Sequence, residues 1–342
     1  MVELVDTSDL KSDARMSMRV QFPPEVPNQN KQQDRGTTMT INLGYACINM
    51  ELQKQKICCN RGMIKRTFKA KGINYASELS LINVKALREI IKWNNNNDIS
   101  VYRMTSCLFP WFSEYDIFDL PDIDKIADVM ADAGKIAMDA GQRLSFHPGP
   151  FNCLGSHKDN VVQKTIAELN AHSTQMDLMG LPESPMAKIN IHIGGAYGEH
   201  EKTMARFCKN FKQLAPSTQA RLTVENDDRA SLFSTKMLYN GVSRHIDIPI
   251  VFDSHHHELG KQDSTYREAF YMARETWQRR NTKQQCHHSN SKKNYEDSTV
   301  KVTAHSDWYY TPFENFGEPA DVVLECKKKE QALIKYRQDF GV

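Results

Sequence analysis

Metal-binding side chains recur at the ends of short apolar segments along the 342-residue chain. The complete set is His147, His192, Glu225, Asp253, His256, His287, His305 and Glu325. A single histidine in such a place is more often a hydrogen-bonded structural residue than a ligand. Burying this many ionisable groups without an ion, however, would cost a large amount of free energy. The pattern therefore predicts a cluster of two or three divalent cations with bridging carboxylates.

The donor types indicate which ions and which chemistry to expect. Imidazole and carboxylate ligands without thiolate suit Mn²⁺, Mg²⁺, Zn²⁺ or Fe²⁺, so Cys286 and Cys326 are interpreted as small packing residues. A pair of such ions can hold both the attacking and the leaving oxygen of a phosphodiester. The consecutive His255, His256 and His257 are expected to supply at most one or two ligands, because adjacent side chains of a strand point to opposite faces.

Short apolar segments alternate with segments of helical periodicity after the first forty residues. Strands are predicted at 41–48, 99–105, 143–147, 188–193, 221–226, 248–253, 284–288 and 321–326. Helices are predicted at 76–93, 122–141, 161–179, 201–214, 231–245, 265–277 and 330–340. Continuous apolar strands, each followed by a helix, favour an α/β fold with a parallel sheet, here a (β/α)8 TIM barrel. The candidate ligands would then meet at the C-terminal ends of the strands.

Two stretches fall outside this alternation. Residues 286–320 are too long for a bare connection and predict a functional insertion after the seventh strand, with 300–305 as a candidate extra strand. Residues 1–38 are polar and interrupted by prolines, which predicts a disordered leader. The leader also resembles the translation product of a transfer-RNA gene upstream of the true start. Met39 would then be the natural first residue, and the barrel domain would span 39–342.

Composition limits the partners and the compartment. The 44 Lys and Arg against 42 Asp and Glu give a net charge of +2, so any affinity for DNA must come from local clustering. A basic run between Arg61 and Lys71 includes Lys65 and Arg66 and is expected to contact phosphates, although a solvated loop fits the composition equally well. Without a membrane-spanning segment or a secretory signal, we expect an intracellular, non-secreted protein with reduced cysteines and no membrane partner.

Several of these segments together resemble the UV damage endonucleases. The matching segments are LGYACIN (43–49), MTSCLFPW (104–111), RLSFHPGPF (143–151), INIHIGGAYG (189–198), RLTVENDD (221–228), VFDSHHHEL (251–259), AHSD (304–307) and VVLECKKKEQAL (322–333). The resemblance implies a TIM barrel related in layout to endonuclease IV and to the xylose-isomerase-like barrels. It also implies a DNA repair endonuclease that cuts duplex DNA on the 5′ side of cyclobutane pyrimidine dimers and 6-4 photoproducts. Such an enzyme uses a divalent metal cluster, with manganese expected first, and no ATP.

The resemblance assigns metal ligation to all eight candidate ligands by position. The catalytic groups expected among them are Glu225, His256 and Glu325. One departure from the family lies before His287, where the family has a Lys-x-His pattern whose lysine can be carboxylated to assist the metals. This chain has Gln285 at that position and Lys283 two residues earlier. Either the modification is absent, or the register of the seventh strand is shifted by two residues.

The resemblance also implies contacts to UV-damaged double-stranded DNA by a monomeric protein. Tyr45 and Asn49 match residues that line the lesion pocket of the family. The segment HPGPF departs from the family's usual His-Pro-Gly-Gln-aromatic pattern, in which the glutamine and the aromatic wedge into the duplex. Phe151 keeps the aromatic wedge, whereas Pro150 lacks the hydrogen bonds of the amide. We therefore expect DNA binding with an altered lesion preference.

Two alternatives remain open from the sequence. A metal-dependent sugar isomerase or epimerase on a xylose-isomerase-like barrel would use two metals and fewer histidines, and would need neither a basic rim nor a wedge. A damaged-DNA-binding protein with a decayed catalytic cluster is opposed by the intact ligand set and favoured by Pro150 and Gln285. The metal content of the purified protein separates this second alternative from the two enzymes.

Overall fold

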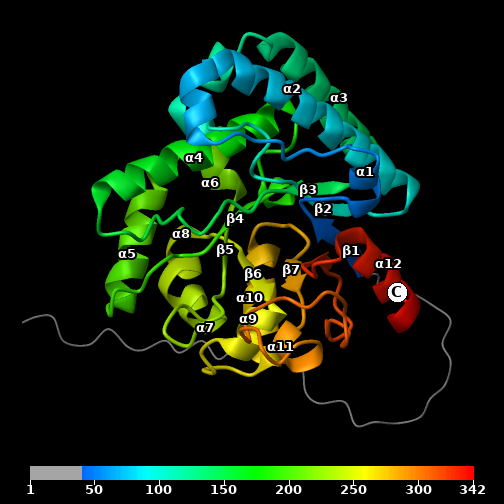
Figure 1. The fold of residues 1–342 in the computed structure, drawn as a ribbon. Helices are drawn as coiled ribbons and strands as arrows, with labels where there is room; N and C mark the ends of the chain where they lie inside the picture. The colour runs from blue at the N-terminus through cyan, green and yellow to red at the C-terminus, as the bar shows by residue number, and fades with distance from the viewer. Residues whose placement is uncertain (1–40) are drawn as a thin grey trace, which may run out of the picture. The chain divides into compact units, whose positions relative to one another are not determined.

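The computed structural model describes residues 41–342, which form a ring of parallel strands surrounded by helices (Figure 1). The predicted leader, residues 1–38, and the proposed start at Met39 lie outside the described residues. The strands are β1 Asn42–Ala46, β2 Val101–Arg103, β3 Arg143–Ser145, β4 Ile189–Ile191, β5 Leu222–Glu225, β6 Ile250–Asp253, β7 Gln285–His288 and β8 Asp321–Leu324. Each of them lies within a segment predicted as a strand and is shorter than that segment.

The strands follow the order β3-β2-β1-β8-β7-β6-β5-β4, and every neighbouring pair is parallel. The two ends of this order meet at Phe146, which forms an isolated parallel bridge with Ile189. The Phe146 nitrogen donates to the Lys188 carbonyl oxygen, and the Phe146 carbonyl accepts from the Asn190 nitrogen, both at 2.9 Å. The predicted (β/α)8 barrel is therefore confirmed, with a narrow seam between β3 and β4.

Helices connect the strands and cover the outside of the barrel. The α-helices are α1 Met50–Lys54, α2 Lys65–Asn96, α3 Ile123–Asp139, α4 Asp159–Leu178, α5 His200–Phe211, α6 Pro216–Arg221, α7 Thr235–Leu238, α8 Arg244–Ile246, α9 Ser254–Leu259, α10 Tyr266–Arg279, α11 Lys292–Tyr295 and α12 Lys329–Phe340. Short 3-10 turns are η1 Phe112–Glu114, η2 Ile117–Asp119 and η3 Pro185–Ala187, and η4 Tyr239–Ser243 is a π-helical turn. All seven predicted helical segments overlap helices of the structure.

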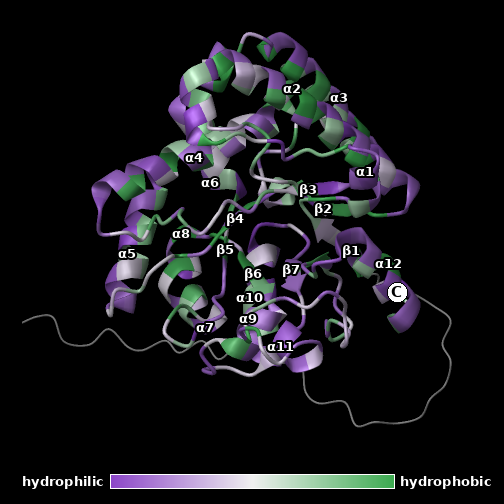
Figure 2. Ribbon diagram, in the orientation of Figure 1, coloured by the Kyte–Doolittle hydropathy of each residue, from purple (hydrophilic) through white to green (hydrophobic). Residues whose placement is uncertain are grey.

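Apolar side chains at helical spacing attach the outer helices to the barrel. In α3, Ile126, Met130, Ala133 and Ala137 are all buried, which places them along one side of the helix. The helices α2, α3 and α5 accordingly carry both hydrophobic and hydrophilic residues in Figure 2. Within residues 41–342, no helix is both long and apolar enough to cross a membrane.

Two local predictions were wrong, and the structure decides one open alternative. Most of the basic run lies in the first turns of α2 and not in a loop, and the helix kinks at Gly72, where φ is +63°. Residues 300–305 form no strand, and only His305 pairs with Ser291 in an isolated antiparallel bridge. His255, His256 and His257 lie in α9 and not in a strand, because Asp253 caps this helix by accepting from the His256 nitrogen at 2.8 Å. Successive helical residues point about 100° apart, so the three rings diverge.

A buried histidine joins α4 to the barrel wall. The ring of His172 packs edge-on against Phe112 at 5.2 Å and Phe146 at 4.9 Å between ring centroids. Its Nδ1 donates to the Glu168 carbonyl oxygen at 2.8 Å. Burial lowers the pKa of His172 from 6.5 to about 4, so the ring is neutral in the folded protein at neutral pH.

The pH dependence of stability should report this neutral ring. Between pH 6.5 and about 4 the unfolded chain binds a proton at His172 that the folded chain does not, so stability falls as the pH falls through this window. His172→Leu removes the effect, and its free energy of unfolding should therefore fall less than that of wild type, by up to about 3 kcal/mol. Urea unfolding of both metal-free proteins between pH 7 and pH 4 measures the difference. Parallel curves for the two proteins would contradict it.

Candidate metal centre

The candidate ligands lie at the C-terminal ends of the barrel strands. His147 follows β3, His192 follows β4, Glu225 ends β5, Asp253 ends β6, His287 lies in β7, Glu325 follows β8, His256 belongs to α9, and His305 lies in the β7–β8 connection. Since all the strands are parallel, these positions share one face of the barrel. Glu225 and Asp253 are buried there, and the remaining carboxylate, Glu325, is partly buried.

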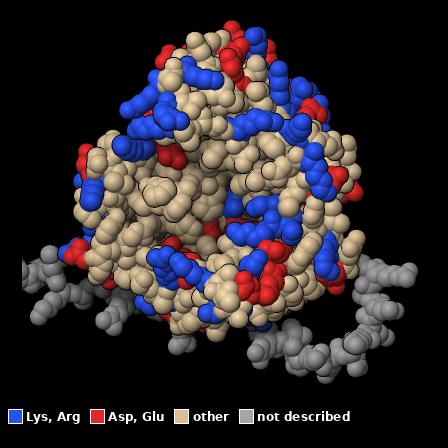
Figure 3. Space-filling model, viewed as in Figure 1, with Lys and Arg blue, Asp and Glu red and all other residues tan. Residues whose placement is uncertain are grey.

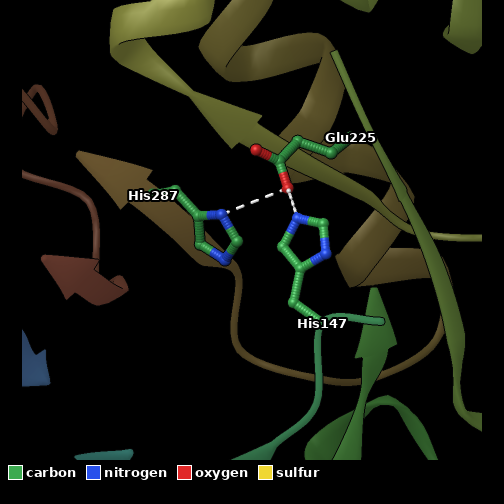
Figure 4. Close-up of side chains that lie close together, drawn as sticks. All are labelled: His147, Glu225 and His287. Carbon is green, nitrogen blue, oxygen red and sulfur yellow. Dashed lines mark ion pairs between the residues drawn. The ribbon is translucent and has the colours of Figure 1, made fainter. Parts of the chain in front are cut away.

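The carboxylate of Glu225 lies among three imidazoles and is 1% exposed. Its Oε2 is 3.1 Å from His147 Nε2 and 3.1 Å from His287 Nδ1, and both rings point toward it in Figure 4. Its Oε1 is 3.3 Å from His256 Nδ1. Asn190 donates its side-chain N–H to Oε2 and so fixes the orientation of the carboxylate. Both oxygens of Glu225 therefore face imidazole rings.

The ligand atoms form three overlapping groups, each with its atoms within 4.8 Å of one another. These groups are His147 with Glu225 and His287, His192 with Glu225 and His256, and Asp253 with His287 and Glu325. Glu225 and His287 each belong to two groups, and the two oxygens of Glu225 suit a carboxylate shared by adjacent ions. His305 belongs to none of them. Its Nε2 is 3.9 Å from Glu325 Oε2, and its Nδ1 is 2.7 Å from the Ser289 hydroxyl.

The ionisable groups of the cluster shift one another's pKa values. Burial alone would raise the pKa of Glu225, but the imidazoles of His287, His192 and His147 outweigh it and hold that pKa well below its ordinary value. Burial, together with the neighbouring carboxylates, raises the pKa of Asp253 to about 7. Burial would lower the pKa of His192, yet Glu225 and Asp227 dominate and raise it to about 10. Such opposed shifts mark a site organised around charge.

Three buried ligand atoms support a bound cation. Asp253 Oδ2, His192 Nδ1 and His287 Nδ1 are buried and have no hydrogen-bond partner. Unsatisfied buried polar atoms are costly, and cations held at the cluster would satisfy them. The donor set of imidazole nitrogens and carboxylate oxygens fits Mn²⁺, Mg²⁺, Zn²⁺ or Fe²⁺. All eight cysteines are free, as expected for reduced thiols, and none belongs to the three groups. Cys286 and Cys326, which were expected to be packing residues, are buried.

Four further residues of the site were not predicted from the sequence. Asp227 Oδ1 lies 3.2 Å from His192 Nδ1, and Arg103 at the end of β2 forms an ion pair with Glu325. The other two are Asn190 and Lys188 of the β4 segment. Lys188, Asn190 and His192 alternate along one strand, so the two-residue periodicity of strands was the signal that could have identified them. Arg103 lies inside the predicted strand 99–105, and its charge within an apolar segment was the signal that could have identified it.

Lys188 lies next to His287 in the interior of the barrel. Its side chain is completely buried, and its Nζ is 3.2 Å from His287 Nε2. Burial, aided by Arg103 and Arg143, lowers the pKa of Lys188 to about 7, although Glu225 opposes the shift. Lys188 thereby holds the side of the His287 ring that faces away from Glu225.

The structure resolves the register of β7. His287 faces the cluster, whereas Lys283 precedes the strand and forms an ion pair with Asp321 at 2.7 Å. The structure therefore brings His287 to the cluster as expected, and Gln285 lies two residues before it, where the resemblance implies a lysine. The Gln285 side chain is fully buried, and neither its oxygen nor its nitrogen has a hydrogen-bond partner.

The predicted lesion contacts divide into exposed and buried residues. Phe151 is 89% exposed, and the neighbouring Pro150 is also exposed, in the loop that follows His147. Tyr45 and Asn49 are buried instead. The Tyr45 hydroxyl donates to Asn94 Oδ1 at 2.8 Å and accepts from Asn49 Nδ2 at 2.9 Å. These bonds satisfy both side chains within the protein, and their role as lesion contacts stays a prediction.

Basic side chains border the open face of the barrel. Arg61, Lys65 and Arg66 are exposed at the start of α2 and just before it. Phe68 of the same helix stacks on Trp111 with 5.9 Å between centroids, which attaches this segment to the loop after β2. In Figure 3 the surface is hollowed near its centre, and Lys and Arg residues lie around the hollow. This distribution suits a polyanion.

Fold and site together define a TIM barrel with a histidine- and carboxylate-rich cluster that could bind metal ions. A family model described as UV-endonuclease UvdE matches residues 41–341, so the chain belongs to this family. The UV-damage endonuclease of Schizosaccharomyces pombe is 29% identical over 98% of this chain and 61% of its own length. The UV DNA damage endonuclease of Bacillus anthracis is 27% identical over 76% of this chain and 81% of its own. The chain thus spans less than two thirds of the yeast protein.

Solved structures agree with this assignment. The crystal structure of SacUVDE superimposes with a TM-score of 0.76 and 26% identity, covering 88% of this chain and 98% of that one. A 3-keto-D-glucoside 4-epimerase of Escherichia coli has a TM-score of 0.51 at 8% identity, over the same shares of the two chains. The second likeness shows the barrel fold alone.

Replacing the shared carboxylate should remove bound metal. In Glu225→Gln the amide would place a neutral group between His147, His256 and His287, so we expect the affinity for Mn²⁺ to fall by more than about 100-fold, the upper end for outer-shell changes. Metal analysis after dialysis, together with calorimetric titration, measures the loss. Glu201→Gln, at an exposed position of α5, is the matched control. Equal metal content in both variants would contradict the bridging position.

Removing the buried amine should also weaken metal binding. Lys188→Met keeps the length of the side chain but removes the group next to His287 Nε2, so the ring loses the contact that orients it. Partners of metal ligands are worth about 10–100-fold in affinity, and we expect a loss of this size for Mn²⁺. Lys54→Met, an exposed change in α1, should leave the affinity unchanged. Wild-type affinity in Lys188→Met would show that His287 needs no such partner.

Proposed function

We propose that this protein is a metal-dependent DNA repair endonuclease that hydrolyses the phosphodiester 5′ to UV photoproducts in duplex DNA. The proposal rests on one observation above all, the Glu225 carboxylate that faces imidazoles on both of its oxygens in a member of the UV-endonuclease family. Cyclobutane pyrimidine dimers and 6-4 photoproducts are the proposed lesions. Two or three divalent ions, with manganese expected first, are the proposed cofactor, and no ATP is needed.

The residues of the cluster would divide the chemical work. When bound, the divalent ions supply Lewis-acid activation of water and of the scissile phosphate. Glu225 would be shared between neighbouring ions, because it belongs to two ligand groups and has two oxygens, whereas His287 would give its one free nitrogen, Nδ1, to a single ion. Burial would lower the pKa of Arg103, but Glu325 beside it dominates and keeps the guanidinium charged. A fixed cation next to the carboxylates would help to bind the phosphodiester at this face.

Lesion recognition would use the difference in stacking between damaged and undamaged DNA. Extruding bases from a duplex costs least where damage has already weakened stacking. Phe151, 89% exposed in the loop that directly follows the ligand His147, is suited to enter the distorted step as a wedge. Pro150 beside it would add an apolar surface without hydrogen-bond donors. The exposed Arg61, Lys65 and Arg66 would contact phosphates, which positions the duplex without reading its sequence.

Family membership leaves the sugar isomerase alternative without support, since the similarity to epimerases is one of fold only. The decayed binding protein differs from the proposed enzyme in a measurable way. It would bind damaged DNA without consuming it, and it would do so with or without metal. The cleavage assay below separates the two.

A labelled-duplex assay tests the proposed activity. A 5′-labelled duplex with one cyclobutane pyrimidine dimer is incubated with protein and either Mn²⁺ or EDTA, beside an undamaged duplex and an abasic-site duplex. We expect a Mn²⁺-dependent cut immediately 5′ to the dimer, reduced by at least about 100-fold in Glu225→Gln because the ligand that joins two metal groups is lost. Glu201→Gln should cut like wild type.

Other outcomes would revise the proposal in defined ways. Cutting at the abasic site alone would indicate a different damage specificity on the same scaffold. Binding to the dimer duplex without any cut, in protein that retains no metal when Mn²⁺ is supplied, would support the decayed binding protein. Protein that contains metal but does not cut the dimer duplex would indicate a lesion preference altered by Pro150. A cut that persists in EDTA after exhaustive dialysis would contradict the role of the metals.

A further inference from the structure

An exposed aromatic residue, Tyr197, lies on the loop that leaves the metal centre after His192. Its side chain is 47% exposed, and its φ is +53°. This left-handed conformation is uncommon for residues other than glycine and costs free energy in a bulky residue. Gly194 and Gly198, on either side, also have positive φ values of +98° and +74°. The tight loop therefore presents a tyrosine at a position where the backbone favours glycine.

Neighbouring side chains hold the exposed ring of Tyr197 in place. His157 packs edge-on against it with 4.6 Å between centroids, and the Arg206 guanidinium lies 5.9 Å from its centroid. Arg206 is itself fixed, since it donates to the Gly155 carbonyl oxygen at 3.0 Å and to the Thr203 hydroxyl at 2.7 Å. A β-carbon on Gly195 would lie 3.2 Å from Tyr197 Cζ, so the ring also packs over this backbone.

The loop of Tyr197 interlocks with the loop that carries Phe151. A β-carbon on Gly194 would meet Cys153 Sγ at 2.6 Å, and the Cys153 thiol donates to the Pro150 carbonyl oxygen at 3.4 Å. His157, which supports the tyrosine ring, belongs to the same loop as Phe151. Two exposed aromatic residues thus stand on interlocked loops that directly follow β3 and β4, at the open face of the barrel.

We propose that Tyr197 is a second lesion contact, which stacks on a base of the distorted duplex beside the step entered by Phe151. A strained residue persists where its surroundings hold it, and such residues cluster at ligand sites. An exposed aromatic ring that is already fixed loses little conformational freedom when it stacks on a base. The proposal rests on the proposed function, since it requires DNA at this face. It adds a specificity residue that acts on binding and not on hydrolysis.

Single-turnover cleavage of the dimer duplex with Mn²⁺ tests this role, because it measures DNA binding and the rate of hydrolysis separately. In Tyr197→Ala and Tyr197→Gly, the protein concentration that gives half the maximal rate should rise about ten-fold, the size expected for one base stack. The maximal rate should stay within about two-fold of wild type, because no metal ligand changes. Tyr197→Phe keeps the ring and should behave like wild type.

Two controls separate stacking from a structural role. Met138→Ala removes a side chain that is 46% exposed at the end of α3, on the opposite end of the barrel, and should change nothing. The affinity for undamaged duplex, measured by fluorescence anisotropy, should also stay unchanged in all Tyr197 variants, since its bases remain stacked. A 2-aminopurine placed beside the dimer should be quenched by wild type and Tyr197→Phe, but not by Tyr197→Ala.

The outcomes that overturn the inference are distinct from failure of the proposed function. Wild-type binding in Tyr197→Gly, or an equal loss on damaged and undamaged duplex, would exclude stacking on the lesion while wild type still cuts at the dimer. If wild type neither prefers nor cuts the dimer duplex, the proposed function itself fails, and the role of Tyr197 fails with it.

Discussion

A buried carboxylate shared by three imidazoles is the constraint on which the rest of this structure depends. Glu225 is 1% exposed and contacts His147, His256 and His287 within 3.3 Å. The pKa values around it move in opposite directions, since His192 is raised and His287 is lowered. Charged and neutral groups therefore lie side by side in this buried cluster at neutral pH, and divalent cations bound there would neutralise the carboxylates and take the imidazoles as ligands.

The barrel can bring these side chains together because the C-terminal ends of its parallel strands lie at one face. Few backbone hydrogen bonds close the ring, since β3 and β4 are joined through the isolated bridge at Phe146. The loops that follow these two strands compensate by packing against each other through Cys153 and Gly194, and through His157 and Tyr197. The segment that closes the barrel therefore also carries the exposed aromatic side chains next to the metal centre.

The strands could be predicted from the sequence because each is a short apolar segment with a polar end, as in RLTVEN (221–226), whose Glu225 belongs to the site. The helix cap at Asp253 could not be recognised from the sequence pattern. A strand was expected through His255, His256 and His257, but the Asp253 carboxylate accepts from the His256 nitrogen and starts a helix there. The burial of Tyr45 could not be predicted either, because it depends on Asn94, which is distant in sequence and reaches its hydroxyl only in the fold.

Lys188 shows most clearly what a linear pattern omits. The resemblance places a lysine two residues before His287 on the same strand, and Gln285 stands there with both amide atoms unpartnered. The amine that lies next to His287 comes instead from the β4 segment, across the barrel, at 3.2 Å from Nε2. The interior of a narrow barrel brings side chains of non-adjacent strands into contact, so an amine at one point in space can come from more than one strand. A sequence motif defined by residue spacing can identify only a lysine on the same strand as His287. The contacts of the His287 ring identify the neighbouring amine whichever strand it comes from.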